Sequence, residues 1–296
     1  MKKKTAKSNE TKQDVFERVT EQLIAAMEET KGNWRKPWIG ASFGMASNAK
    51  TKIEYQGGNA LILGFMGGGE WATFKQWQEL GAQVKKGSKG VGCIKWVSYT
   101  KETSVIKTNG DNALYHGMFP NCFTVFSADQ VDGYEPQPIE ERTDVEKFAA
   151  AELIIEESNA MIEWLPQDKA YYAPLRDEIS MPLLKQFETT EDYYSVLLHE
   201  LTHWSGHSSR MDRFPALGQR TTAEYAFEEL IAEIGSAFLL AHCGLSPQPR
   251  KDHAEYLASW IKRCKDEPRA MFSAASKAQA AVNFILHKQA QQEQAA

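Results

Sequence analysis

The spacing of apolar positions predicts helices in both halves of the chain. In residues 14–28, Phe16, Val19, Leu23 and Met27 recur every three or four positions, which places them on one stripe of an amphipathic helix. Four further helices are predicted from the same kind of pattern, over residues 144–162, 223–243, 250–264 and 269–288.

Shorter apolar runs predict strands. Residues 91–99 and 119–126 have this character, and the polar segment 101–117 between them contains Asn109-Gly110, which favours a hairpin tip. Residues 170–181 are expected to supply further short strands. The predicted fold class is therefore α+β, with a mixed α/β N-terminal half and a largely helical C-terminal half.

The pattern is interrupted at residues 132–143, where Gly133, Pro136, Pro138 and several acidic residues predict a linker. A chain of 296 residues is long enough for two domains. We expect a disordered basic tail over residues 1–13, which hold five lysines, and domains over residues 14–131 and 144–290.

The net charge of −5 conceals an asymmetry between these halves. Residues 1–134 hold 18 Lys and Arg against 13 Asp and Glu, a net charge of +5, whereas the remainder holds 16 against 26, a net charge of −10. Such an asymmetry suggests that the N-terminal half binds nucleic acid. The four cysteines lack paired spacing and no long apolar run is present, so we expect a cytoplasmic protein that makes no membrane contact.

The composition of residues 31–107 refines the nucleic-acid prediction. This segment holds 12 basic and 4 acidic residues interleaved with aromatic residues such as Trp34 and Trp38. Cations that follow phosphates and aromatic faces that stack on bases are the combination that binds single-stranded DNA. Trp71 and Trp77 are instead expected in the core.

The most specific motif is His199-Glu200-Leu201-Thr202-His203, in a largely apolar helix that Gly206 ends. Histidines four residues apart project from one helix face, so their imidazoles can bind one Zn²⁺ ion. Glu200 lies beside the first histidine, where it can take a proton from metal-bound water as the general base.

A catalytic zinc site needs a third protein ligand, and the predicted helix 223–243 offers one. Glu229 is assigned as this ligand, with Glu233, one turn later, orienting a histidine from behind. Glu233 or Glu228 could replace Glu229 as the ligand. The alternative interpretation of Glu224 and Glu228 is that they are merely exposed acidic residues near the start of the helix.

Residues 177–182, 193–207 and 225–233 resemble the C-terminal half of the ArdC-type antirestriction proteins of conjugative plasmids. Asn48 and residues 55–59, 71–77 and 81–87 are similar to the N-terminal domain of that family, which is also found in plasmid TraC-type primases. Gly58 departs from the pattern, because an aliphatic residue is expected there.

The resemblance implies a single-stranded-DNA-binding domain followed by a zincin-like metallopeptidase domain, and protection of incoming plasmid DNA from host restriction. It favours phosphate contacts by lysines of a Gly-rich turn over a solvated hairpin rim. The implied DNA contacts are Lys85, Lys86 and Lys89, with polar contacts from Asn59, Thr73 and Gln76.

Two functional readings remain open. In the first, His199, His203 and Glu229 hold Zn²⁺, and the protein cleaves an unidentified host protein. Mn²⁺ is the alternative ion, because the same donors suit it. In the second, the chain masks DNA or a restriction enzyme, and the zincin domain is structural or inactive. A structural site normally has four protein ligands, and His207 is the candidate for the fourth.

Overall fold

The computed structural model describes residues 14–29, 45–106, 112–136, 142–214, 221–245 and 253–287. The predicted tail, Trp34, Trp38 and the central part of the predicted linker lie outside these residues. Among the described residues, helices and strands are mixed, which confirms the α+β prediction.

The N-terminal half is built on a four-stranded sheet in the order β1-β2-β5-β4. The β1–β2 pair is parallel, and the β2–β5 and β5–β4 pairs are antiparallel. A small sheet pairs β3 with β6. The elements, in chain order, are α1 (Val15–Glu29), β1 (Ser47–Asn48), α2 (Gly57–Phe65), β2 (Glu70–Thr73), α3 (Phe74–Glu79), β3 (Gln83–Val84), β4 (Val91–Ile106), β5 (Asn112–Ser127), the 3-10 turn η3 (Ala128–Gln130) and β6 (Val131–Asp132).

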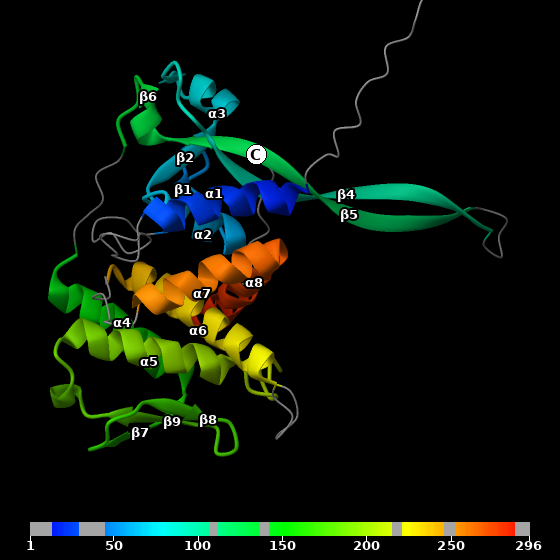
Figure 1. Ribbon diagram of the computed structural model, residues 1–296. Helices are drawn as coiled ribbons and strands as arrows, with labels where there is room; N and C mark the ends of the chain where they lie inside the picture. Colours follow the sequence, from blue (N-terminus) through cyan, green and yellow to red (C-terminus); the bar gives the residue numbers. More distant parts are fainter. Residues whose placement is uncertain are drawn as a thin grey trace, which may run out of the picture.

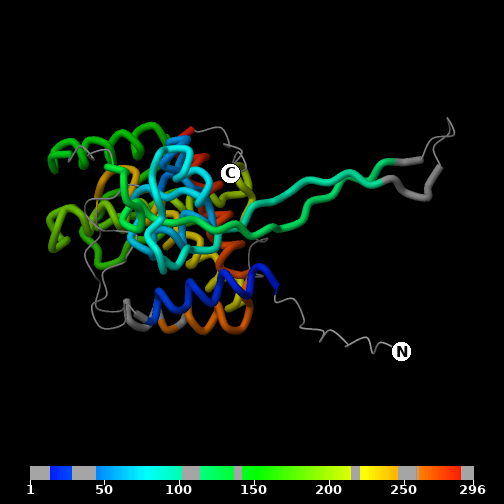
Figure 2. Tube along the Cα trace, turned by 90° about the horizontal axis from the view of Figure 1, so that it is seen from above, coloured from blue at the N-terminus to red at the C-terminus, as the bar shows by residue number. Residues whose placement is uncertain are grey.

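Strands β4 and β5 form a hairpin much longer than the sequence pattern predicts. Each strand has 16 residues, and pairing continues into the segment predicted as a polar tip, for instance Thr100 with His116 and Lys101 with Tyr115. The paired backbone groups satisfy one another across the ladder, so the strands continue although few of their side chains are buried. The hairpin leaves the body of the molecule as an arm (Figures 1 and 2).

The C-terminal half is largely helical and carries one three-stranded sheet in the order β7-β9-β8. Helix α5 packs against strands β8 and β9 of this sheet and against α6 (Figure 1). The elements are α4 (Asp144–Ser158), β7 (Met161–Leu165), β8 (Tyr171–Ala173), β9 (Glu178–Pro182), the 3-10 turn η4 (Leu184–Gln186), α5 (Thr190–Ser205), α6 (Thr222–Cys243), α7 (His253–Asp266) and α8 (Pro268–Ile285).

Local signals fix where the helices of this half begin and end. Thr143 caps α4 through a capping box with Glu146, and Asn159 ends the helix in the left-handed conformation. Pro268 occupies the first turn of α8, where the missing N–H costs no helical hydrogen bond.

The two halves share one hydrophobic core, and α8 lies between them. This helix packs against α1 and α2 of the N-terminal half and against α5 and α6 of the C-terminal half (Figure 1). The Thr20 hydroxyl donates to the Pro268 carbonyl at 2.8 Å, and the Gly57 N–H donates to the Gln279 side chain at 3.2 Å. The C-terminal helices therefore join the halves as well as closing the second one.

Gly58, the departure from the family pattern, lies at this junction. A Cβ atom on Gly58 would stand 2.1 Å from Cδ1 of Phe272 on α8. The ring of Phe272 thus occupies the space that a larger residue at position 58 would need.

Candidate metal centre

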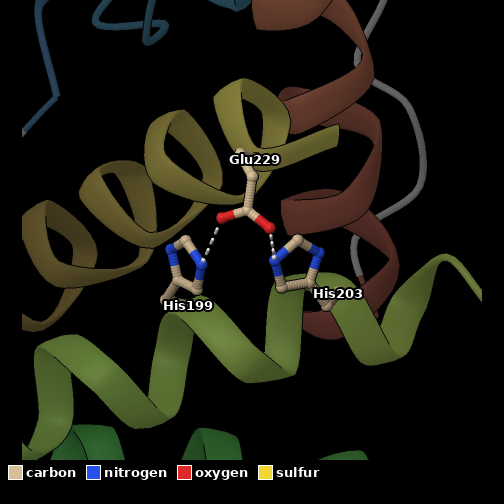
Figure 3. Close-up of side chains that lie close together, drawn as sticks. All are labelled: His199, His203 and Glu229. Atoms are coloured by element: carbon tan, nitrogen blue, oxygen red, sulfur yellow. Dashed lines mark ion pairs between the residues drawn. The ribbon is translucent and has the colours of Figure 1, made fainter. Parts of the chain in front are cut away.

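Helix α5 carries the two histidines on one face. The Thr189 side chain accepts a hydrogen bond from the Asp192 N–H at the start of the helix, and Gly206 ends it. The ring centroids of His199 and His203 lie 4.8 Å apart, and both rings point toward α6 (Figure 3).

Helix α6 places Glu229 opposite both imidazoles. A capping box between Thr221 and Glu224 fixes the start of the helix two turns earlier. The Glu229 carboxylate lies between the rings, with Oε2 at 3.5 Å from His199 Nε2 and Oε1 at 3.4 Å from His203 Nε2 (Figure 3). One ligand atom from each of the three side chains lies within 4.8 Å of the others.

Each histidine is backed by a second carboxylate of α6. Glu233 Oε1 lies 3.6 Å from His199 Nδ1, in the place expected for an orienting group. Glu228 Oε1 lies 3.3 Å from His203 Nδ1. With a carboxylate facing Nδ1, each ring directs its Nε2 toward Glu229.

Glu228 corrects one expectation from the sequence. It is 5% exposed rather than a solvated acid near the helix start, and Arg213 pairs with both of its oxygens at 2.9 and 3.2 Å. Arg213 also donates to the Thr202 carbonyl on α5. The pairing of Glu228 with Arg213 was not predicted, because Arg213 lies outside any predicted helix and only the fold brings it to Glu228.

The charges of the site alter the pKa values of His203, Glu228 and Glu229. Burial acts to lower the pKa of His203, but the Glu228 and Glu229 carboxylates outweigh it and raise this pKa to about 9. Burial acts to raise the pKa of Glu229, but the two facing imidazoles hold it well below its usual range. Glu229 therefore interacts electrostatically with both imidazoles.

Glu200 and His207 lie differently with respect to this group. Glu200 is 8% exposed, and its charge contributes to the raised pKa of His203, so it is near the site. His207 follows the end of α5, and its Nδ1 is 2.8 Å from the Ser209 hydroxyl. Within the described part of the chain, His207 is not among the clustered ligand atoms.

The polar residues proposed as DNA contacts have structural roles instead. Asn59 is 4% exposed and exchanges two hydrogen bonds with the Ile94 backbone. Thr73 and Gln76 form the capping box of α3, and Gln76 also accepts from Asn48. Asn59 and Gln76 are buried and offer little surface to DNA, whereas Thr73 is half-buried.

The three lysines of the Gly-rich turn are exposed, as phosphate contacts must be. Lys85 donates to the Asp129 carbonyl at 2.9 Å and lies 3.9 Å from Asp132, so it is partly engaged within the protein. Trp71 and Trp77 are buried in the core, as predicted.

Comparison with known proteins assigns both halves. Residues 13–126 match the family model described as the N-terminal domain of the anti-restriction factor ArdC, and residues 149–277 match the one described as a zincin-like metallopeptidase. The metal-free crystal structure of the antirestriction protein ArdC from plasmid R388 is 35% identical, with a TM-score of 0.72, over 94% of this chain and 100% of that one. The chain belongs to the ArdC antirestriction family.

Two further comparisons extend this family assignment. The Mn(II)-bound crystal structure of R388 ArdC matches with 34% identity and a TM-score of 0.69, over 93% of this chain and 97% of that one. Protein y4eC of Sinorhizobium fredii (strain NBRC 101917 / NGR234) is 35% identical over 95% of this chain and 94% of its own length.

A second kind of relative is much longer than this ArdC-family chain. The DNA primase TraC of Escherichia coli is 36% identical over 94% of this chain, which spans 27% of that primase.

Among the helices of the described residues, none combines the length and apolar character needed to cross a bilayer.

Proposed function

We propose that this chain is a metal-dependent peptidase that binds single-stranded DNA and protects incoming plasmid DNA from restriction by acting on a host protein. The observation that supports it most is the convergence of His199, His203 and Glu229, with Glu200 on the same helix. Membership of the ArdC family supports the antirestriction role.

The donor set fits a catalytic divalent ion. Two imidazole nitrogens and one carboxylate form the ligand set of many zinc peptidases, and they leave a coordination position for water or substrate. Zn²⁺ is our proposed ion. Mn²⁺ suits the same donors, and a crystal structure of the related R388 ArdC protein is Mn(II)-bound. Glu229 is partly exposed, so the site has access to solvent.

The side chains around the site define the proposed chemistry. A bound divalent ion would polarise the scissile carbonyl and lower the pKa of water toward about 7. Glu200 would accept the proton of the attacking water and donate it to the leaving amine. Glu228 and Glu233 keep the Nδ1 protons of the two rings in place, so that the Nε2 atoms remain free to bind the ion.

Single-stranded DNA binding is proposed for the N-terminal half. The net charge of +5 over residues 1–134 supports it, and so does the similarity to a DNA primase. Lys85, Lys86 and Lys89 are exposed and remain the proposed phosphate contacts.

Metal binding is the first test of the proposal. Purified protein titrated with Zn²⁺ is expected to bind about one ion per chain, and His203→Ala to lose most of this affinity. Glu200→Gln is the matched control on the same helix, and it should bind the ion as wild type does because Glu200 is not a ligand. A wild-type protein that binds no Zn²⁺ and no Mn²⁺ would overturn the catalytic proposal.

The masking hypothesis makes a different prediction about Glu200. A chain that only covers DNA or a restriction enzyme needs no general base, so it would protect DNA equally well with Glu200 replaced. The buried position of Glu200 beside the ligands favours the catalytic reading.

A further inference from the structure

The arm formed by β4 and β5 has two different faces. In an antiparallel pair, residues directly opposite each other point to the same side of the sheet, and successive residues alternate between sides. The pairs Val97–Phe119, Tyr99–Gly117 and Lys101–Tyr115 are therefore on one face. Leu114 and the pairs Trp96–Pro120, Ser98–Met118 and Thr100–His116 are on the other.

Three aromatic rings form a ladder on the first face. The ring centroid of Tyr99 lies 6.2 Å from that of Tyr115 and 6.0 Å from that of Phe119. Gly117 lies directly beneath Tyr99, because a Cβ atom there would be 2.6 Å from the Tyr99 ring. Without a side chain at position 117, Tyr99 can lie flat between its two neighbours across the strand.

This ladder is exposed. Tyr99, Phe119 and Tyr115 are 41%, 46% and 55% exposed, respectively, so the described helices leave the outer surface of all three rings in solvent. Contact among the rings stabilises the hairpin, but it does not use these outer surfaces. Clustered aromatic rings on a protruding element mark a binding surface more often than a lone exposed residue does.

The charge on this face is positive. Lys95 and Lys101 lie on it at either side of the ladder, about 20 Å apart along the strand at the usual rise per residue. Segments 95–101 and 115–121 contain no Asp or Glu. A ligand that carries both flat apolar rings and negative charges fits this arrangement.

We propose that the Tyr99–Tyr115–Phe119 ladder, flanked by Lys95 and Lys101, is a stacking platform for single-stranded DNA. Unpaired bases stack on the ring faces while the lysines contact phosphates, a mode that requires no particular base sequence. This inference rests on the proposed single-strand binding and places it on the arm, whereas the lysines of the Gly-rich turn lie in a different part of the N-terminal half.

The opposite face of the arm supplies the control. Leu114 and Met118 are 51% and 62% exposed, so they resemble the ladder residues in apolar character and exposure. That face has no lysine between residues 95 and 102 or between 114 and 120. Replacing Leu114 and Met118 with alanine is therefore expected to leave DNA binding unchanged.

The test uses the full chain and a fluorescein-labelled oligothymidine, with affinity measured by anisotropy. Tyr115→Ala and Phe119→Ala are each expected to weaken binding about 5- to 150-fold, the range for loss of one stacked base. Tyr115→Phe keeps the ring and should bind as wild type does, and so should Leu114→Ala combined with Met118→Ala. Lys101→Ala should reduce the salt dependence of binding by about one phosphate contact.

Each other outcome has a distinct meaning. If wild type binds the oligonucleotide and Tyr115→Ala and Phe119→Ala bind equally well, the platform is overturned while single-strand binding stands. Equal losses from both faces of the arm would overturn the assignment to the ladder face. If wild type does not bind the oligonucleotide at low salt, the proposed single-strand binding itself fails.

Discussion

Buried ion pairs around His203 couple the metal centre to the packing of the second half. Glu228 contacts His203 on one side and Arg213 on the other, and Arg213 reaches the backbone of α5 at Thr202. The same carboxylate therefore faces a proposed ligand and neutralises a buried guanidinium. Its loss should affect both metal affinity and stability.

Glu228→Gln is expected to weaken metal affinity about 10- to 100-fold, because the amide is a weaker acceptor for the His203 Nδ1 proton. The measurement is competition with a chelating dye. Glu224→Gln is the matched control, since this exposed residue on the same helix can still complete the capping box. Equal affinity of Glu228→Gln and wild type would show that Glu228 does not support the ligand.

Metal binding should also release a proton. The pKa of His203 is raised to about 9 in the metal-free protein, yet a metal ligand must be unprotonated. Affinity should therefore rise with pH until the pH reaches about 9, the pKa of His203 in the folded protein. Calorimetry at pH 7 in buffers of different ionisation enthalpy should detect the released proton, and an enthalpy independent of the buffer would contradict this expectation.

The stability of the metal-free protein should have the opposite pH dependence. A raised pKa means that protonated His203 stabilises the fold fully below the unfolded value of about 6.5. This contribution is lost as the pH rises through about 9. Thermal unfolding of chelator-treated protein at several pH values measures it.

At the scale of the residue, the sequence was sufficient to predict which three side chains the structure brings together. The four-residue spacing of His199 and His203 and the apolar helix around Glu229 depend on local periodicity, which a sequence displays directly. The ion pair of Arg213 with Glu228 depends on a chain reversal between α5 and α6, and no local pattern reports that. The buried hydrogen bonds of Asn59 and Gln76 were hidden for the same reason, since their partners Ile94 and Asn48 are distant in sequence.

At the scale of the element, the contact of α2 with α8 depends on one missing side chain. Gly58→Ala is expected to destabilise the protein by about 1–3 kcal/mol, because its Cβ would overlap the Phe272 ring. Phe272→Leu should relieve much of this cost, so the two substitutions should be strongly non-additive in urea unfolding. Additive effects on the free energy of unfolding would mean that the Phe272 ring does not cause the cost of Gly58→Ala.

The elements themselves were predicted unevenly. The predicted helices carried clear periodicity and capping residues, such as Thr221 with Glu224, and the structure contains them. The helix predicted over residues 144–162 is shorter, because Asn159 ends α4 and residue 161 already begins β7. The length of β4 and β5 was underestimated because residues 101–117 are polar, and a strand exposed on both faces lacks the alternation that marks a half-buried one. Its pairing is fixed by the backbone ladder rather than by the side-chain pattern.

At the scale of the whole molecule, the shared core makes the halves interdependent. The sequence predicted a linker and two domains, but it could not show that α8 packs against α1 and α2. A fragment of residues 1–131 would expose the apolar surfaces that α7 and α8 cover. We therefore expect this fragment to be less stable than the same residues in the full chain.

Cysteine labelling can test this interdependence. Cys93 in the first half and Cys243 and Cys264 in the second are buried, and burial raises the pKa of both Cys243 and Cys264 to about 12. They should resist alkylation in the native protein and become reactive at the same urea concentration. Reaction of Cys93 in a separate, earlier transition would show that the halves unfold independently.

At the centre of the proposed function, chemistry at the metal site protects DNA. The most direct test is the survival of plasmid DNA that enters a restricting recipient in the presence of wild-type or Glu200→Gln protein. Loss of the general base should slow the chemical step about 10²- to 10⁴-fold while metal content and oligonucleotide affinity stay unchanged. We expect Glu200→Gln to give no more protection than an empty vector, and protection equal to that of wild type would contradict the account and favour masking.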